Sequence, residues 1–243
     1  MTETGSIDEQ RIASVRENVK IIRERIRQAA VRAGRAPDSV RFMAVTKTVE
    51  PAYINAAIDE GVDLIGENKV QEFLGKKDAL RLDGVETHLI GHLQTNKVNK
   101  IVGQVDMIQS VDSLNLARAV DRRSEALGIV TPVLVEVNIG GEENKTGLDR
   151  ALLDELLAEM AQMRHIAVQG LMTIPPVSDD PAATRSFFSQ MHQLFVDIGD
   201  KKRDNIKMNI LSMGMSGDYE DAIACGSNLV RVGSAIFGAR IYP

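Results

Sequence analysis

The sequence is poor in cysteine and in long apolar runs. Cys225 is the only cysteine among 243 residues, which excludes an internal disulfide and a multi-cysteine metal site and suits a reducing compartment. No apolar run approaches the roughly 20 residues that a membrane-spanning helix needs. The first five residues lack the basic and apolar regions of a signal peptide. We therefore expect a cytoplasmic protein without a membrane segment.

An excess of positive charge is also lacking. The 34 acidic and 29 basic residues give a formal net charge of −5, and the two signs are interspersed along the chain. Proteins that bind nucleic acids normally carry a basic stripe or patch. The composition therefore argues against a nucleic-acid partner.

Apolar periodicity divides the chain into alternating helices and strands. A helix over about residues 7–33 carries one apolar stripe, and Gly34 and Pro37 are expected to end it. Helical periodicity recurs over residues 149–163 and again after Asp180, an N-cap followed by proline at the first helical position. Strand-like runs lie near residues 41–46, 62–66, 86–90, 105–109, 131–139, 166–174, 207–212 and 228–232.

Eight strands that alternate with helices in about 240 residues predict an α/β fold, a single (β/α)8 TIM barrel with an extra N-terminal helix. A doubly wound open sheet is the alternative, although it rarely needs eight strands at this length. We find no linker, low-complexity tract or sequence repeat, so one domain is expected over residues 1–243.

Lys47 closes the first strand-like run. A strand that leaves a packed core delivers its last side chain to the mouth of the fold, partly shielded from water. Desolvation there disfavours the ammonium form and frees the neutral amine to attack a carbonyl. Most lysines after strands are solvated loop residues, so Lys47 alone is a weak indication of a Schiff-base lysine.

Two turns rich in small residues, at residues 211–218 and 230–235, follow the last two strands. In a TIM barrel the last two loops often hold a phosphate, because backbone N–H groups approach the anion closely. Ser216 is expected to cap the helix that follows it. Either turn alone could be an ordinary cap, whereas the two together indicate a phosphate site.

Arg231 has two candidate roles. It either pairs with a carboxylate or donates to the pyridine nitrogen of a cofactor and keeps that nitrogen unprotonated.

Polar clusters end three further strands, at residues 66–68, 90–92 and 138–141. Side chains at the carboxyl ends of barrel strands tend to line the site, although Glu67 and Asn68 could equally cap the next helix. His88 and His92 have the spacing of a helical metal pair but fall across a strand, and no third ligand is obvious. We therefore expect no metal site.

Seven motifs, in order and over nearly the whole chain, resemble the pyridoxal phosphate homeostasis proteins, whose barrel is like the N-terminal domain of alanine racemase. The motifs lie at residues 44–47, 66–72, 88–97, 137–147, 170–172, 211–216 and 230–238. The resemblance implies that Lys47 holds pyridoxal 5'-phosphate as a Schiff base. It implies that the cofactor is surrounded by Asn68, by Arg231 at the pyridine nitrogen, and by Ser212, Met213, Ser216, Gly233 and Ser234 at the phosphate. Lys69 stands where the family often has tyrosine, so an aromatic contact there is in doubt.

Two classes of function agree with these motifs. The first is a monomeric, non-catalytic protein that buffers pyridoxal phosphate or delivers it to dependent apoenzymes. The alternative is a fold-type III pyridoxal enzyme such as an amino-acid racemase. Racemases of this kind carry a further β-domain whose tyrosine is the second acid/base, and the sequence ends at Pro243, after the eighth βα unit. We therefore favour the binding protein over the enzyme. An aldolase that uses Lys47 is a third hypothesis, which the ordered motifs do not support.

Overall fold

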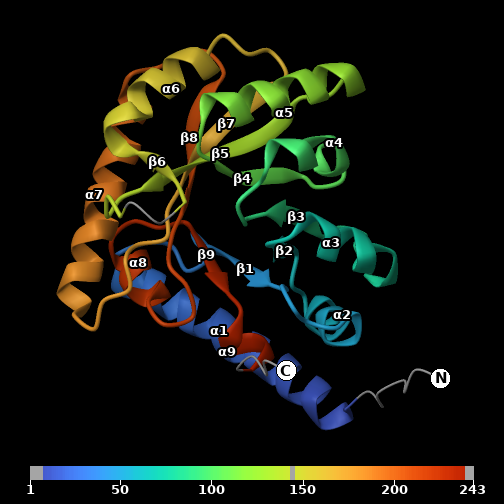
Figure 1. Ribbon diagram of the computed structural model, residues 1–243. Helices are drawn as coiled ribbons and strands as arrows, with labels where there is room; N and C mark the ends of the chain where they lie inside the picture. The colour runs from blue at the N-terminus through green and yellow to red at the C-terminus, as the bar shows by residue number, and fades with distance from the viewer. Residues whose placement is uncertain (1–7, 143–145, 239–243) are drawn as a thin grey trace.

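A closed barrel of eight parallel strands forms the centre of the computed structural model, which describes residues 8–142 and 146–238 (Figure 1). The strands follow the order β4-β3-β2-β1-β9-β8-β7-β5, and pairing between β4 and β5 closes the ring. The barrel prediction is thus confirmed against the open sheet. The barrel strands are β1 Arg41–Val45, β2 Leu64–Glu67, β3 Glu86–Leu89, β4 Met107–Val111, β5 Thr131–Asn138, β7 Ile166–Met172, β8 Ile206–Ser212 and β9 Leu229–Val232. A short ninth strand, β6 Leu148–Asp149, pairs with β5 and was not predicted.

Helices follow the strands on the outside of the barrel. The predicted helix over 149–163 is shorter than expected, because a 3-10 turn at Arg150–Leu152 precedes α6. The predicted cap at Asp180 is confirmed, since its carboxylate accepts the Ala182 N–H at 2.9 Å. The helices are α1 Glu9–Arg32, α2 Pro51–Asp59, α3 Val70–Lys76, α4 Val98–Ile101, α5 Leu114–Leu127, α6 Leu153–Met160, α7 Pro181–Asp200, α8 Tyr219–Ala224 and α9 Ser234–Phe237.

The extra N-terminal helix, α1, packs across the outside of the barrel against α2, α8 and α9 (Figure 1). Its apolar stripe is buried at Val15, Val19, Ile22 and Ile26, as the periodicity predicted. The Asp8 carboxylate accepts two N–H groups of the first turn and so begins the helix. This helix therefore joins the first and last βα units from outside.

Polar side chains fill part of the barrel interior. His88, Gln109, Ser212 and Arg231 are each no more than 3% exposed. Buried polar groups destabilise a fold unless they are hydrogen-bonded, so these four must find partners inside the barrel. Their bonds are described with the site, because Arg231 also borders it.

Gly170 lets β7 approach β8 at the point where the pairing register shifts. Its φ is +149°, and a Cβ built there would lie 1.8 Å from the Ile210 carbonyl oxygen. That oxygen belongs to the backbone of a central strand and cannot move away cheaply. Glycine is therefore required at this position for the barrel to keep its geometry.

We predict that Gly170→Ala lowers the free energy of unfolding by about 3 kcal/mol or more, because the new methyl group overlaps the β8 backbone. Urea unfolding followed by circular dichroism measures the change. Gly75→Ala in α3 is the matched control, since nothing lies within 4 Å of a Cβ there. The control should be neutral or stabilising by up to about 1 kcal/mol. Equal effects of the two substitutions would contradict the prediction.

Candidate functional site

A cavity of about 300 Å³ opens at the carboxyl ends of the barrel strands, where TIM barrels place their active sites. Six of the eight predicted site residues line this cavity: Lys47, Asn68, Ser216, Arg231, Gly233 and Ser234. The rest of its wall is formed by Val45, Ile90, Ile174, Met215 and Gly217. Ser212, the last residue of β8, and Met213, which follows it, are fully buried and do not line the cavity.

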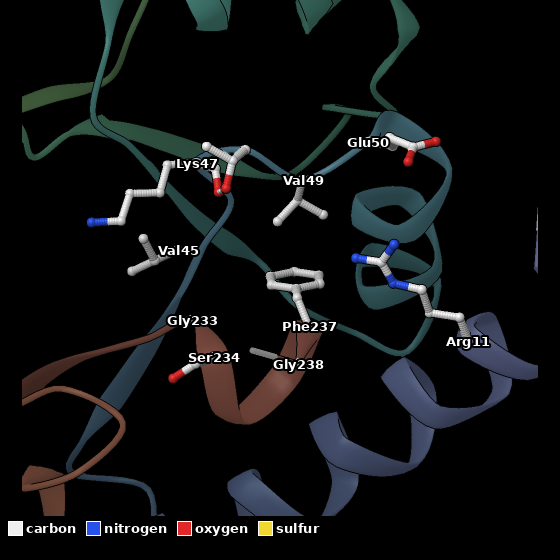
Figure 2. A pocket seen from close by; sticks show the side chains of 10 residues that line it. Arg11, Val45, Lys47, Val49, Glu50, Gly233, Ser234, Phe237 and Gly238 are labelled. Atoms are coloured by element: carbon white, nitrogen blue, oxygen red, sulfur yellow. Dashed lines mark hydrogen bonds between the residues drawn. The ribbon is translucent and has the colours of Figure 1, made fainter. Parts of the chain in front are cut away.

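A second cavity of about 190 Å³ extends toward Arg11, Glu50 and Phe237. It shares four lining residues with the first: Val45, Lys47, Gly233 and Ser234. In Figure 2 the Lys47 side chain extends away from Phe237 and Arg11. The amine therefore does not point into this second cavity. The larger cavity, which also contains Asn68 and Arg231, is the candidate site.

The turn after β1 holds Lys47 in a constrained backbone. Thr48, the next residue, has φ +61°, a left-handed conformation that is unfavourable for a β-branched side chain. Its N–H donates to a Glu72 carboxylate oxygen at 2.5 Å. Backbone strain beside a candidate reactive lysine persists only where surrounding contacts enforce it.

Those contacts come from a buried ionic cluster formed by Thr46, Glu67, Glu72 and Lys76. The Lys76 Nζ atom lies 2.7 Å from Glu67 and 3.0 Å from Glu72, and it donates to the Thr46 carbonyl at 2.8 Å. The Thr46 hydroxyl donates to Glu67. Burial raises the pKa of Glu67, against the lowering effect of the hydrogen bonds from Lys76 and Thr46. The cluster thus ties the residues on both sides of Lys47 to α3. The sequence analysis did not identify it, although Glu72 and Lys76 have the i, i+4 spacing of a helical ion pair.

Ser216 joins the two loops that follow β8 and β9. Its hydroxyl oxygen accepts the N–H groups of Gly233 at 3.2 Å and Ala235 at 3.3 Å. The expectation that Ser216 caps the next helix is wrong, because α8 begins at Tyr219 and Asp218 takes the cap position. The long-range bonds to the β9 loop replace that local role, so the two loops predicted to hold a phosphate lie side by side.

Arg231 is buried in β9 and borders the cavity. Its guanidinium donates to the Ser212 hydroxyl at 2.7 Å and to the Thr173 carbonyl at 2.8 Å. Desolvation lowers the pKa of Arg231 to about 10, while Glu136 and Asp218 oppose that shift. The side chain therefore remains a cation at neutral pH. Arg231 was predicted either to pair with a carboxylate or to donate to a pyridine nitrogen. Among the described residues, no carboxylate lies within 4 Å of its guanidinium.

Asn68 carries an unsatisfied acceptor in the cavity wall. Its Oδ1 atom is buried and has no hydrogen-bond partner among the described residues. Such an atom destabilises the fold by about 1–3 kcal/mol unless a ligand or water donates to it. The alternative role as a helix cap is not adopted, because α3 begins at Val70 without a side-chain cap. Asn68 therefore fits a polar ligand.

Comparison with known proteins identifies the family of this chain. Residues 12–241 match the family model of the alanine racemase N-terminal domain. The pyridoxal phosphate homeostasis protein of Aquifex aeolicus is 41% identical over 226 residues, which cover 93% of this chain and 98% of that protein. This chain belongs to the pyridoxal phosphate homeostasis protein family. The resemblance noted in the sequence is thereby confirmed.

Solved structures of relatives share the barrel. An unknown protein from Bifidobacterium adolescentis superposes with a TM-score of 0.91 at 40% identity, covering 95% of this chain and 97% of its own. PipY of Synechococcus elongatus, solved with PLP bound, gives a TM-score of 0.77 at 34% identity and covers 87% of this chain and 98% of its own.

Over residues 8–142 and 146–238, none of the helices has the length and apolar character that a membrane span requires.

We predict that Lys76→Met lowers the free energy of unfolding by about 3 kcal/mol at pH 7, because Glu67, which is 0% exposed, loses its counter-ion. Burial raises the pKa of Glu67 and Lys76 lowers it, so loss of Lys76 raises that pKa further and the variant takes up a proton on Glu67 at a higher pH than the unaltered protein. The deficit should therefore shrink as the pH is lowered from 7 toward 5.

Urea unfolding at several pH values measures this dependence. Lys201→Met is the control, because Lys201 makes an exposed pair with Asp154 that should contribute less than about 1 kcal/mol. A deficit for Lys76→Met that does not change with pH would contradict the assignment to Glu67.

Proposed function

We propose that the protein binds pyridoxal 5'-phosphate in the 300 Å³ cavity as a monomer in the cytoplasm, and that it buffers or delivers the cofactor rather than using it in catalysis. The observation that carries the proposal is one cavity that unites a strand-end lysine, two serine- and glycine-bearing loops and a buried arginine. Membership of the family and the PLP-bound structure of PipY support it.

Lys47 would hold the cofactor covalently. Bound pyridoxal phosphate supplies an aldehyde that condenses with a primary amine. Lys47 is half-buried in the turn after β1, and the cluster around Lys76 restricts the backbone from which its side chain extends. Its side chain lines the cavity together with the apolar side chains of Val45 and Ile90.

The loops after β8 and β9 would hold the phosphate. Ser216 and Ser234 offer hydroxyl groups at the cavity wall, and Gly217 and Gly233 leave the backbone accessible. A Cβ at Gly217 would meet nothing within 4 Å, so that backbone borders open space. Ser212 and Met213 were also predicted here, and their buried positions support a role beneath the loop rather than at the cavity surface.

Arg231 would donate a hydrogen bond to the pyridine nitrogen. A guanidinium has no acceptor and stays protonated at neutral pH, so a ring nitrogen that faces it accepts and remains unprotonated. An unprotonated ring is a weaker electron sink, which slows removal of an α-proton. Arg231 thus favours binding without turnover.

The cavity wall also argues against an amino-acid racemase. Two-sided proton transfer needs a second acid/base, and the wall has no carboxylate, histidine, cysteine or tyrosine among the described residues. Tyr53 is buried in α2 and Tyr219 in α8. Lys47 and Arg231 are the titratable side chains there, and Arg231 is held by hydrogen bonds.

We predict that the purified protein is yellow and that Lys47→Ala loses the visible band while it keeps its fold. Borohydride reduction followed by peptide mass mapping should place the pyridoxyl group on Lys47. Lys97→Ala, which removes a lysine outside the cavity, should keep the band. A pyridoxyl group on Lys97, or on Lys145 outside the described residues, would refute the assignment.

We predict that Ser216→Ala weakens the binding of pyridoxal phosphate by about tenfold or more, since a hydrogen bond to a charged group contributes about 1.5–3 kcal/mol. The affinity for pyridoxal, which has no phosphate, should change little. Both affinities are measured by absorbance titration, with Ser14→Ala in α1 as the control. An equal loss for the two ligands would mean that Ser216 does not act on the phosphate.

We predict that the loaded protein gives up pyridoxal phosphate to a dependent apoenzyme and does not turn over amino acids. The first part is measured by the activity that the apoenzyme recovers, and the second by a screen for racemised, transaminated or decarboxylated products. Steady turnover that disappears with Lys47→Ala would show an enzyme instead. Absence of transfer, with binding intact, would restrict the function to buffering.

A further inference from the structure

A line of hydrogen bonds runs through the interior of the barrel from Arg231 toward the opposite mouth. Arg231 contacts the Ser212 hydroxyl at 2.7 Å, Ser212 contacts Gln109 Oε1 at 2.8 Å, and Gln109 Nε2 contacts His88 Nδ1 at 2.8 Å. The His88 Nε2 atom then lies 3.3 Å from Glu86 Oε2, a longer contact whose geometry falls short of a full hydrogen bond. Four strands, β9, β8, β4 and β3, contribute to this line.

The orientation of the Gln109 amide, with Oε1 toward Ser212 and Nε2 toward His88, determines the direction of each bond in the line. Arg231 can only donate, so Ser212 accepts from it and has one proton left to donate. That proton goes to Gln109 Oε1, which leaves the Gln109 amide N–H₂ to donate onward. His88 Nδ1 must then accept, so the ring proton sits on Nε2 and faces the Glu86 carboxylate.

Glu86 provides an acceptor at the far end. It is half-exposed at the first residue of β3 and also contacts Arg41 at 3.1 Å. The contact with His88 is the largest influence on the pKa of Glu86, and with Arg41 it lowers that pKa to about 2 against the opposing effect of burial. The carboxylate is therefore ionised, and able only to accept, throughout the neutral range.

We infer that Gln109 and His88 are positioning residues for Arg231, which hold its guanidinium through Ser212 so that it faces the ring nitrogen of the bound cofactor. This inference rests on the proposed function. It gives a role to His88, which lies in the motif at residues 88–97 but had no predicted function. It also gives a role to Gln109, which belongs to none of the motifs. Ser212 becomes the link to Arg231 rather than a phosphate contact.

The line of bonds holds the part of the Arg231 guanidinium that the Thr173 carbonyl does not reach. A long arginine side chain loses rotamer entropy when it is held in one geometry. The Thr173 carbonyl holds only one of its terminal nitrogens. The Ser212 hydroxyl holds the other, and it is itself oriented only while Gln109 accepts its proton. Loss of Gln109 therefore loosens Arg231 without touching the cavity wall.

Two ligands separate this role from a merely structural one. They are pyridoxal phosphate and its 1-deaza analogue, in which C–H replaces the ring nitrogen, so that Arg231 has nothing to donate to. Absorbance titration of Gln109→Leu should show about tenfold or more weaker binding of pyridoxal phosphate, the loss expected for a hydrogen bond to a charged group. Binding of the deaza analogue should be unchanged. Ser124→Ala, which removes an equally buried hydrogen bond in α5, should alter neither.

A second pair of variants acts at the far end of the line, where folding is less at risk because Glu86 is half-exposed. Glu86→Ala should show the same selective loss in weaker form, and Glu86→Gln, which keeps an acceptor for His88, should restore binding. Equal losses for the two ligands, or none in Gln109→Leu and Glu86→Ala, would overturn the inference. If the unaltered protein binds neither ligand, the proposed function itself fails.

Discussion

Lys76 is the last residue of α3, and its Nζ atom lies 2.7 Å from a carboxylate oxygen of the fully buried Glu67. Neither charge would be stable there alone, because removing an ion from water is expensive. Lys76 donates to the Thr46 carbonyl, Glu67 accepts the Thr46 hydroxyl, and Glu72 accepts the N–H of the strained Thr48. The backbone on both sides of Lys47 is therefore held by this pair and by Glu72.

The interior of the barrel follows the same principle on a larger scale. A packed apolar interior would be more stable, yet β3, β4, β8 and β9 direct His88, Gln109, Ser212 and Arg231 inward. A buried guanidinium that borders a cavity needs hydrogen-bond acceptors on the side that faces the barrel interior. Each polar residue of the line provides a hydrogen-bond partner for the next one toward the cavity. In the barrel interior, polar side chains thus take the place of apolar ones, and the Arg231 guanidinium is held at the border of the candidate site.

The relation to the alanine racemase domain shows how little the fold itself decides about activity. In this chain the (β/α)8 frame brings Lys47, Arg231 and the loops after β8 and β9 to one cavity. Proton transfer to and from both faces of a substrate needs one further group, and the described wall of the cavity has none. Function lies in the side chains placed at the mouth of the barrel, not in the barrel.

The sequence by itself determined the alternation of eight strands with helices, the N-terminal helix, and the positions of Lys47 just after the first strand and of Arg231 near the end of the last. These follow from local periodicity and from the rule that a barrel presents the carboxyl ends of its strands. Motif order identified the family, since the ordered segments span almost the whole chain.

Only the tertiary structure decided which polar residues meet. Ser216 bonds to a loop 17 residues away instead of capping its own helix, and Ser212 bonds to Gln109, 103 residues earlier in the chain. Lys76 reaches Thr46 across 30 residues. Periodicity reports the face on which a side chain lies but not its partner, because the partner depends on strand order, register and the closure of the barrel.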